Sequence, residues 1–144
     1  MILIFGGAYQ GKKEIAIEQF KKSKAASQCA ELAGDDRASI EVAPVICDCS
    51  KGQEPDFDAD IIYGLEGFAF ECVKKQMEAK EFMATNAEKW RDKILVVTDV
   101  SQGVVPIDRD VRAFREMNGR MMIYLAEVAD MVIRVFCGIG KDIK

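Results

Sequence analysis

A short apolar run at the start of the chain breaks into glycines and then into a helix-like pattern. Residues 2–5 are Ile, Leu, Ile and Phe, and the chain continues as Gly6-x-x-x-x-Gly11-Lys12. This order predicts a buried strand, a loop whose backbone N–H groups curl around a phosphate, and a helix that directs its positive end at the same anion. The pattern is typical of a phosphate-binding P-loop, in which Lys12 reaches the outer phosphates. The residues expected to contact the nucleotide are Gly6, Gly7, Ala8, Tyr9, Gln10, Gly11, Lys12 and Lys13.

Position 13 departs from this motif. A P-loop carries a serine or threonine hydroxyl there to ligate magnesium, and this chain has Lys13. An ammonium has three donors and no lone pair, so it repels a metal cation and cannot bind one. The sequence therefore predicts phosphate binding and argues against Mg²⁺ as a cofactor. A glycine turn followed by a surface lysine is the alternative interpretation of the same stretch.

Strand and helix patterns alternate along the rest of the chain. Apolar β-formers predict strands at residues 2–5, 40–49, 61–63, 94–99 and 131–136, and Pro44 indicates an edge or a break in the second of these. Helices are expected from Lys12 to about Leu32, closing near 34–36, from about Phe68 to Trp90, with Met77 among its core residues, and over 109–128 after the cap residue Asp108. Residues 50–60 predict an acidic loop, and Gly138-Ile139-Gly140 a terminal turn.

This alternation predicts a parallel sheet with helices on both faces, that is, a P-loop NTPase-like (RecA-like) α/β fold. A length of 144 residues suits one nucleotide-binding domain over residues 1–144. In such sheets ligands collect at the carboxyl ends of the strands. Gly6, Asp48 and Asp99 are expected at that edge.

Composition excludes several classes of partner and reaction. A net charge of −4 and a pI near 5.0 argue against nucleic acid or an anionic membrane as the partner. We expect a cytoplasmic protein, because no apolar run approaches the length of a membrane span and the 5 cysteines lack the spacing of a disulfide framework. The chain contains no histidine, so the usual near-neutral general base is missing.

Four charged residues are candidates for the chemistry. Asp99 follows four apolar β-formers, the position of the magnesium-linked carboxylate of P-loop proteins, so we predict a role for it in metal binding or catalysis, against the alternative of a turn aspartate. Arg112 and Arg115 lie three residues apart on a predicted helix and could clamp phosphate, although solvated helix arginines are more common. Glu66 could supply a further carboxylate if its loop is suitably shaped.

Motifs at the two ends of the chain resemble a known family. Residues 6–12 match a Gly-Gly-Ala-x-x-Gly-Lys loop, and residues 103–106 match a Gly-[Ile/Val]-Val-Pro turn after a strand that ends in an acidic residue. Phe114-Arg115, Gly119-Arg120 and the tail 138–144 match a helix and a glycine-containing terminus. The chain thus resembles the bifunctional adenosylcobinamide kinase/adenosylcobinamide-phosphate guanylyltransferases of cobalamin synthesis. The resemblance implies a P-loop fold, often in a homo-oligomer, that binds ATP or GTP and a corrinoid.

The central segment, 35–90, departs from that family. Family members are longer there and carry a histidine that accepts GMP, so guanylyl transfer through a histidine is excluded for this chain. The family's second acidic strand end corresponds to residues 63–66, which lack the first carboxylate, and its polar pair after Gly119-Arg120 is replaced by Met122-Ile123. Two interpretations stay open. One is a kinase that uses Lys12 as phosphate clamp and Asp99 for magnesium or the acceptor hydroxyl; the other is a non-catalytic nucleotide- or anion-binding homologue with a regulatory or partner-subunit role.

Overall fold

The computed structural model describes the backbone of residues 1–31 and 42–144. In these ranges the chain forms a six-stranded sheet in the order β2-β3-β4-β1-β5-β6. The first five are parallel, and β6 runs antiparallel to β5. The strands are β1 (Ile2–Gly6), β2 (Ile46–Asp48), β3 (Ile61–Tyr63), β4 (Ile94–Thr98), β5 (Met131–Phe136) and β6 (Ile139–Asp142). The predicted α/β, P-loop NTPase-like fold class is confirmed.

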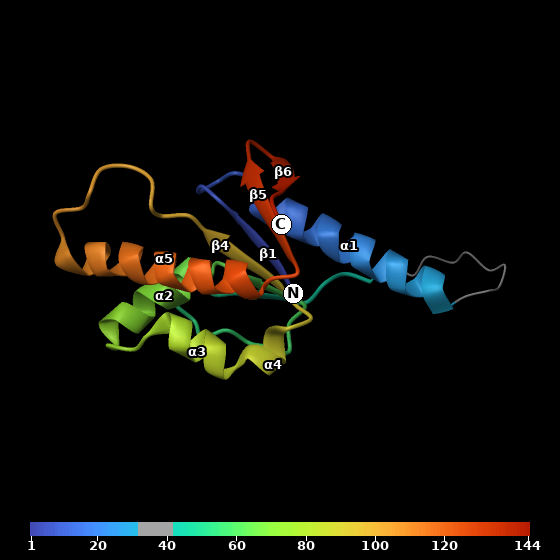
Figure 1. Ribbon diagram of the computed structural model, residues 1–144, viewed down its shortest axis with the longest axis horizontal. Coiled ribbons are helices and arrows are strands. Elements are labelled where there is room, and N and C mark those ends of the chain that lie inside the picture. The colour runs from blue at the N-terminus through green and yellow to red at the C-terminus, as the bar shows by residue number, and fades with distance from the viewer. Residues whose placement is uncertain (32–41) are drawn as a thin grey trace.

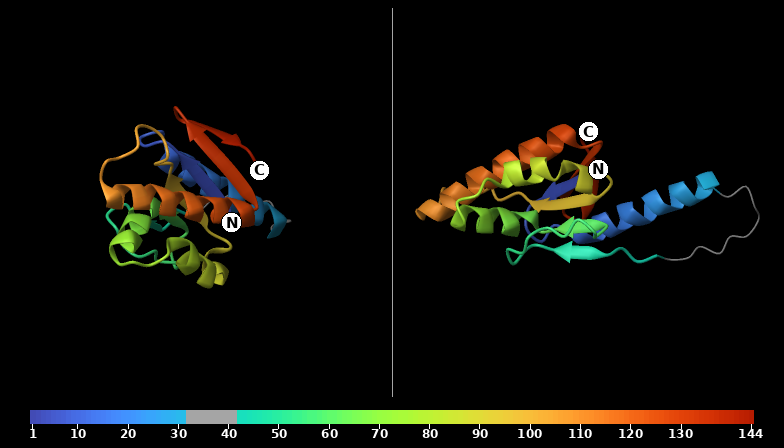
Figure 2. Two further views of the ribbon diagram at one scale, coloured as in Figure 1. Left: turned by 60° about the vertical axis from the view of Figure 1, so that its left-hand side comes forward. Right: turned by 90° about the horizontal axis from the view of Figure 1, so that it is seen from below.

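Alternating side chains of the strands fill two apolar cores, one on each face of the sheet. On one face Ile4, Ile61 and Val96 pack against α1 (Lys12–Glu31). On the other face Leu3, Ile62 and Leu95 pack against the remaining helices. These are α2 (Leu65–Lys74), α3 (Ala79–Thr85), α4 (Ala87–Trp90) and α5 (Arg109–Val128). Figures 1 and 2 show α1 apart from these helices, so the predicted two-sided cover is present but unequal.

The single long helix predicted from Phe68 to Trp90 is wrong. Three shorter helices, α2, α3 and α4, lie within the described residues 65–90. Helix α2 begins at Leu65, directly after Gly64, whose left-handed φ of 74° separates it from β3. It ends at Lys74, shortly before Gln76 takes a left-handed φ of 54°. Met77, expected in the core, lies in the resulting turn and is 42% exposed.

Two predicted strand boundaries also change. The strand expected at 40–49 is shorter: β2 begins at Ile46, after Pro44, which has no N–H to donate to a ladder. It is the edge strand that Pro44 indicated. The expected turn at 138–140 is instead a two-residue turn at Cys137-Gly138, with φ values of 48° and 78°, followed by β6. Residues 40 and 41 and the predicted helix end near 34–36 lie outside the described residues.

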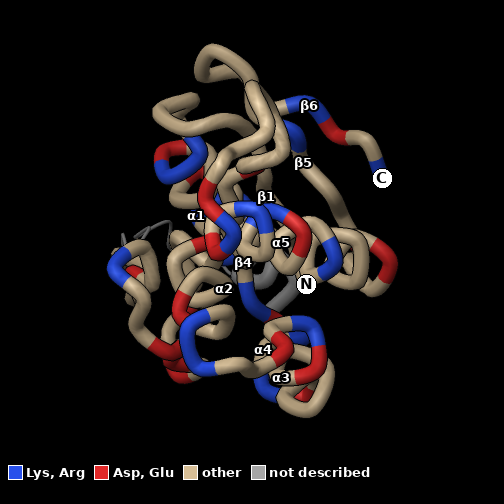
Figure 3. The backbone as a smooth tube through the Cα atoms, turned by 90° about the vertical axis from the view of Figure 1, so that its left-hand side faces the viewer, with Lys and Arg blue, Asp and Glu red and all other residues tan. Residues whose placement is uncertain are grey.

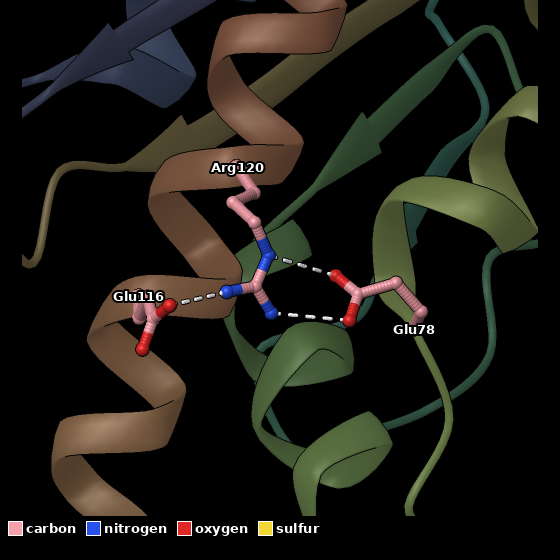
Figure 4. Close-up of polar contacts among 3 residues, drawn as sticks. All are labelled: Glu78, Glu116 and Arg120. Atoms are coloured by element: carbon pink, nitrogen blue, oxygen red, sulfur yellow. Dashed lines mark hydrogen bonds and ion pairs between the residues drawn. The ribbon is translucent and has the colours of Figure 1, made fainter.

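An ion pair joins α5 to the segment before α3. Arg120 donates from Nε and Nη2 to the two carboxylate oxygens of Glu78, at 3.2 and 3.0 Å, and from Nη1 to Glu116 at 2.7 Å (Figure 4). These paired hydrogen bonds hold α5 against the segment before α3. Because both side chains are partly exposed, they contribute about 1 kcal/mol to the free energy of unfolding. Arg120, part of the family-like Gly-Arg pair, therefore acts in packing.

Charges are spread over the molecule. In Figure 3 basic and acidic positions are interspersed over helices and loops on the face in view. Across the part of the chain that the structure describes, no helix combines the length and apolar character that a membrane span requires.

Candidate nucleotide site

The phosphate loop lies between the end of β1 and the start of α1, as the motif predicts. Gly6 pairs with Thr98 of β4 on one side and Val135 of β5 on the other. A Cβ at this glycine would lie 2.3 Å from the carbonyl oxygen of Val135, so the neighbouring strand excludes any larger residue. Tyr9 and Gly11 take left-handed φ values of 58° and 84°. These turns bend the chain back toward the N-terminus of α1, where an anion is favoured.

Lys12 is the buried cation of this loop. Only 4% of the residue is exposed, and its Nζ donates to the carbonyl oxygen of Gly7 at 2.7 Å. Burial lowers the pKa of the Lys12 ammonium, and the nearby Glu66 carboxylate opposes that shift. The ammonium therefore lies inside the curl of the loop, where it bonds the Gly7 carbonyl oxygen, a contact that a phosphate oxygen could replace.

A cavity of about 670 Å³ opens at this loop. Its lining combines the phosphate loop with the carboxyl ends of β2, β3 and β4, the edge where parallel sheets bind ligands. The lining residues are Ala8, Tyr9, Gln10, Gly11, Lys12, Lys13, Glu14, Ser50, Tyr63, Glu66 and Thr98. This volume falls within the range of small-molecule sites.

Glu66 faces the cavity from the first turn of α2. Its carboxylate accepts from the backbone N–H of Thr98 at 2.8 Å and from the Thr98 hydroxyl at 2.5 Å. The carbonyl oxygen of Thr98 accepts in turn from the Asn118 amide on α5, at 3.1 Å. A Cβ at Gly67 would lie 2.3 Å from the carbonyl oxygen of Cys49, so this glycine lets α2 approach the β2 loop and brings Ser50 to the cavity.

Lys13 lies on the β2–β3 side of the cavity. Its Nζ is 5.9 Å from the centroid of the Tyr63 ring. A hydrogen bond from Ser50, with a smaller contribution from the Lys13 charge, lowers the pKa of the Asp48 carboxyl. These surroundings fit Mg²⁺ poorly, because the Lys13 ammonium stands where the motif has a hydroxyl ligand.

Asp99 follows β4 as predicted, but it does not line the cavity. Its backbone N–H donates to the Gly6 carbonyl at 2.9 Å, while its carboxylate accepts from Ser101 N at 2.9 Å and Ser101 Oγ at 2.5 Å. Burial alone would raise the pKa of this carboxyl, yet the hydrogen bonds from Ser101 and Gln102 hold it below its usual value. This geometry is that of a turn aspartate.

Arg112 and Arg115 bind the loop that precedes their own helix. Arg112 Nη1 donates to the carbonyl oxygens of Pro106, at 2.9 Å, and Ile107. Arg115 donates to the carbonyls of Val104, at 2.8 Å, and Ser101. The two guanidiniums hold the 99–108 loop in shape and leave its apolar side chains, such as Val104 at 93%, in solvent.

The structure therefore places Glu66 in the cavity lining with the phosphate loop. Asp99 touches the loop through its backbone N–H, but the side chains of Asp99, Arg112 and Arg115 do not line the cavity. Sequence reasoning did not single out Ser50, Tyr63 or Thr98 as cavity residues. Each lies at or just after the end of a strand, which is the one signal that could have indicated them.

Comparison with known proteins adds the family. A model of the cobinamide kinase / cobinamide phosphate guanyltransferase family matches residues 59–143, more than half of the chain. The chain belongs to this family. The cobinamide kinase family match also covers residues 59–90, part of the segment in which the sequence motifs depart most, so the expectation that the likeness is confined to the two ends is wrong. The phosphate loop lies outside the matched residues.

One curated relative is the bifunctional adenosylcobalamin biosynthesis protein CobU of Salmonella typhimurium (strain LT2). It is 45% identical over 51 residues, which are 35% of this chain. The match spans 28% of the relative's length, well under two thirds of it. The relative supports the family assignment.

Proposed function

We propose that the chain binds the phosphates of ATP or GTP at residues 6–13. The observation that carries this proposal is the buried Lys12 ammonium, which lies within the loop at the edge of the cavity. The positive end of α1 and the ammonium favour an anion at the same place. Membership of the cobinamide kinase family supports the proposal from an independent direction, because the family match does not include the loop.

The reaction we propose is phosphorylation of a corrinoid precursor. The acceptor's hydroxyl oxygen attacks the γ-phosphorus, the bond from that phosphorus to the bridging oxygen breaks, and the nucleoside diphosphate leaves. Lys12 stabilises the charge on the phosphate oxygens. Glu66, which faces the cavity, is better placed than Asp99 to receive the hydroxyl proton, either directly or through water. A homo-oligomer in the cytoplasm is part of the same proposal.

A non-catalytic anion- or nucleotide-binding role is the second candidate, and Lys13 is the observation that favours it. Phosphoryl transfer usually relies on a metal ion that bridges the phosphates. With an ammonium at the ligand position, Lys12 and Lys13 together could neutralise a bound anion without promoting transfer.

Calorimetric titration and a transfer assay distinguish the two candidates. The purified protein is titrated with ATP, GTP and adenosylcobinamide, each with and without magnesium, and is then incubated with [γ-³²P]ATP and adenosylcobinamide. Nucleotide binding with labelled corrinoid product supports the kinase, and binding without product supports the non-catalytic homologue. No binding of either nucleotide would contradict both. With [α-³²P]GTP we expect no acid-labile label on the protein, because the chain has no histidine acceptor.

A further inference from the structure

The turn between β5 and β6 contacts the phosphate loop from the opposite end of the sequence. Figure 1 shows this C-terminal hairpin beside the strand that leads into the loop. The backbone N–H of Cys137 donates to Gln10 Oε1 at 2.5 Å, and that of Gly138 donates to the Gln10 carbonyl oxygen at 3.0 Å. A Cβ at Gly11 would lie 3.3 Å from the Cα of Gly138, so the two backbones are nearly in contact.

Both contacting segments take backbone conformations that need support from their surroundings. Gln10 lies between Tyr9, at a left-handed φ of 58°, and Gly11, at 84°. The turn opposite contains Cys137 at 48° and Gly138 at 78°. Left-handed conformations of residues other than glycine are uncommon and persist where neighbouring groups fix them. The two hydrogen bonds to Gln10 link these turns, and each turn thereby restrains the other.

We infer that the Cys137-Gly138 turn is a positioning element of the anion site and that Gln10 is its positioning residue. Gln10 acts through the loop: its two acceptor oxygens hold the curl in which Lys12 and the backbone N–H groups can meet a phosphate. The inference rests on the proposed anion binding at residues 6–13. Because coupling between two sites is reciprocal, a bound anion also steadies the turn.

The test uses the full chain, with inorganic pyrophosphate as the probe. Gln10→Met keeps the length of the side chain and removes the acceptor for Cys137. Gln53→Met, at an exposed position of the 50–60 loop, is the matched control. We expect pyrophosphate affinity to fall about tenfold in Gln10→Met and to stay within twofold of wild type in Gln53→Met.

Amide hydrogen exchange, followed by NMR, supplies a readout that a purely structural role would not move. In the wild type, saturating pyrophosphate should slow exchange of the Cys137 and Gly138 amides about fivefold or more, and in Gln10→Met this response of Cys137 should be lost. Protection confined to residues 6–13, or unchanged affinity in Gln10→Met, would overturn the inference. Should Gln10→Met fail to fold, the wild-type exchange response decides by itself.

Failure of the inference is distinguishable from failure of the proposed function. If the wild type binds pyrophosphate and Lys12→Met does not, anion binding at the loop stands whatever the result for Gln10→Met. If the wild type does not bind pyrophosphate, or Lys12→Met binds it equally well, both the proposed function and the positioning role are overturned.

Discussion

The loop after β1 and the loop after β4 begin side by side, joined by the hydrogen bond from Asp99 N to the Gly6 carbonyl. Their charged residues nevertheless differ in what they face. In the first loop the Lys12 ammonium bonds one carbonyl of its own loop and lines a cavity. At the second loop Asp99, Arg112 and Arg115 also bond atoms of that loop, but none of the three lines the cavity. Position at the carboxyl edge of a sheet is therefore not enough for a site, because the side chain must also face a space that a ligand can enter.

Replacing the cation of the first loop should have the largest effect. We expect Lys12→Met to weaken pyrophosphate binding about hundredfold, because a charge-assisted contact contributes about 3 kcal/mol. Calorimetry measures the change, with Lys80→Met, on the exposed face of α3, as the control for loss of one positive charge. An affinity within threefold of wild type would show that the anion does not bind at Lys12.

The pH dependence of binding should carry the signature of a buried lysine. Because burial lowers the pKa of Lys12, pyrophosphate affinity should begin to fall at a lower pH than for an ordinary lysine, approaching tenfold per pH unit above that pKa. Lys12→Arg keeps its charge and should lack this fall, and comparing the two proteins cancels the titration of the ligand. Identical profiles would contradict a role for the Lys12 charge.

The same lowered pKa affects stability with the opposite sign. The folded protein disfavours the charged lysine, so between the folded and unfolded pKa values the unfolded chain binds more protons. The free energy of unfolding contributed by this group should therefore rise as pH increases through that window. Lys12→Met should remove this contribution in denaturant titrations at several pH values.

Removing the arginines that hold the 99–108 loop should lower the stability of the protein and leave its pyrophosphate affinity unchanged. We expect Arg112→Ala with Arg115→Ala to lower the free energy of unfolding by about 1–2 kcal/mol, since hydrogen bonds from both guanidiniums to loop carbonyls are lost. Pyrophosphate affinity should change less than twofold. A tenfold loss of affinity in a folded double variant would assign the arginines to the anion site and remove the contrast between the loops.

Adding magnesium should change ATP affinity less than any of the substitutions above changes its own measured quantity. An ammonium fixed about 4 Å from Mg²⁺ is repelled by about 8 kcal/mol at an effective dielectric constant near 20, so either Lys13 moves away or the metal is lost. We expect ATP affinity in excess magnesium and in excess chelator to agree within about threefold, and Lys13→Ser to restore a magnesium dependence. A tenfold or larger gain from magnesium in the wild type, with phosphorylation of adenosylcobinamide, would restore metal-assisted catalysis.

The strands that were predicted well have local signals strong enough to decide their structure. β1 and β4 are built from unbroken runs of four apolar residues, β5 is apolar except for Arg134, and the phosphate loop is a motif of fixed spacing. The break after α2 has no such signal, since Gln76 is neither glycine nor proline and yet takes a left-handed φ. β6 was missed because its short, glycine-containing stretch gains its pairing from β5.

The site shows the same division. Lys12 could be found from its spacing to Gly6. Glu66 received less weight than Asp99, because nothing local indicates that the close approach at Gly67 turns α2 toward the cavity, or that Ser101 occupies the Asp99 carboxylate. The contact between Gln10 and Cys137 joins residues 127 positions apart, beyond the reach of pattern rules.

An NMR titration of backbone amides with pyrophosphate, in chelator, tests the contrast between the loops most directly. The account predicts large shifts at residues 7–13 and smaller ones at Cys137 and Gly138, with residues 101–107 unchanged at saturation. Shifts centred on residues 101–107, with the amides of residues 7–13 unchanged, would contradict the account. They would place the anion at Arg112 and Arg115.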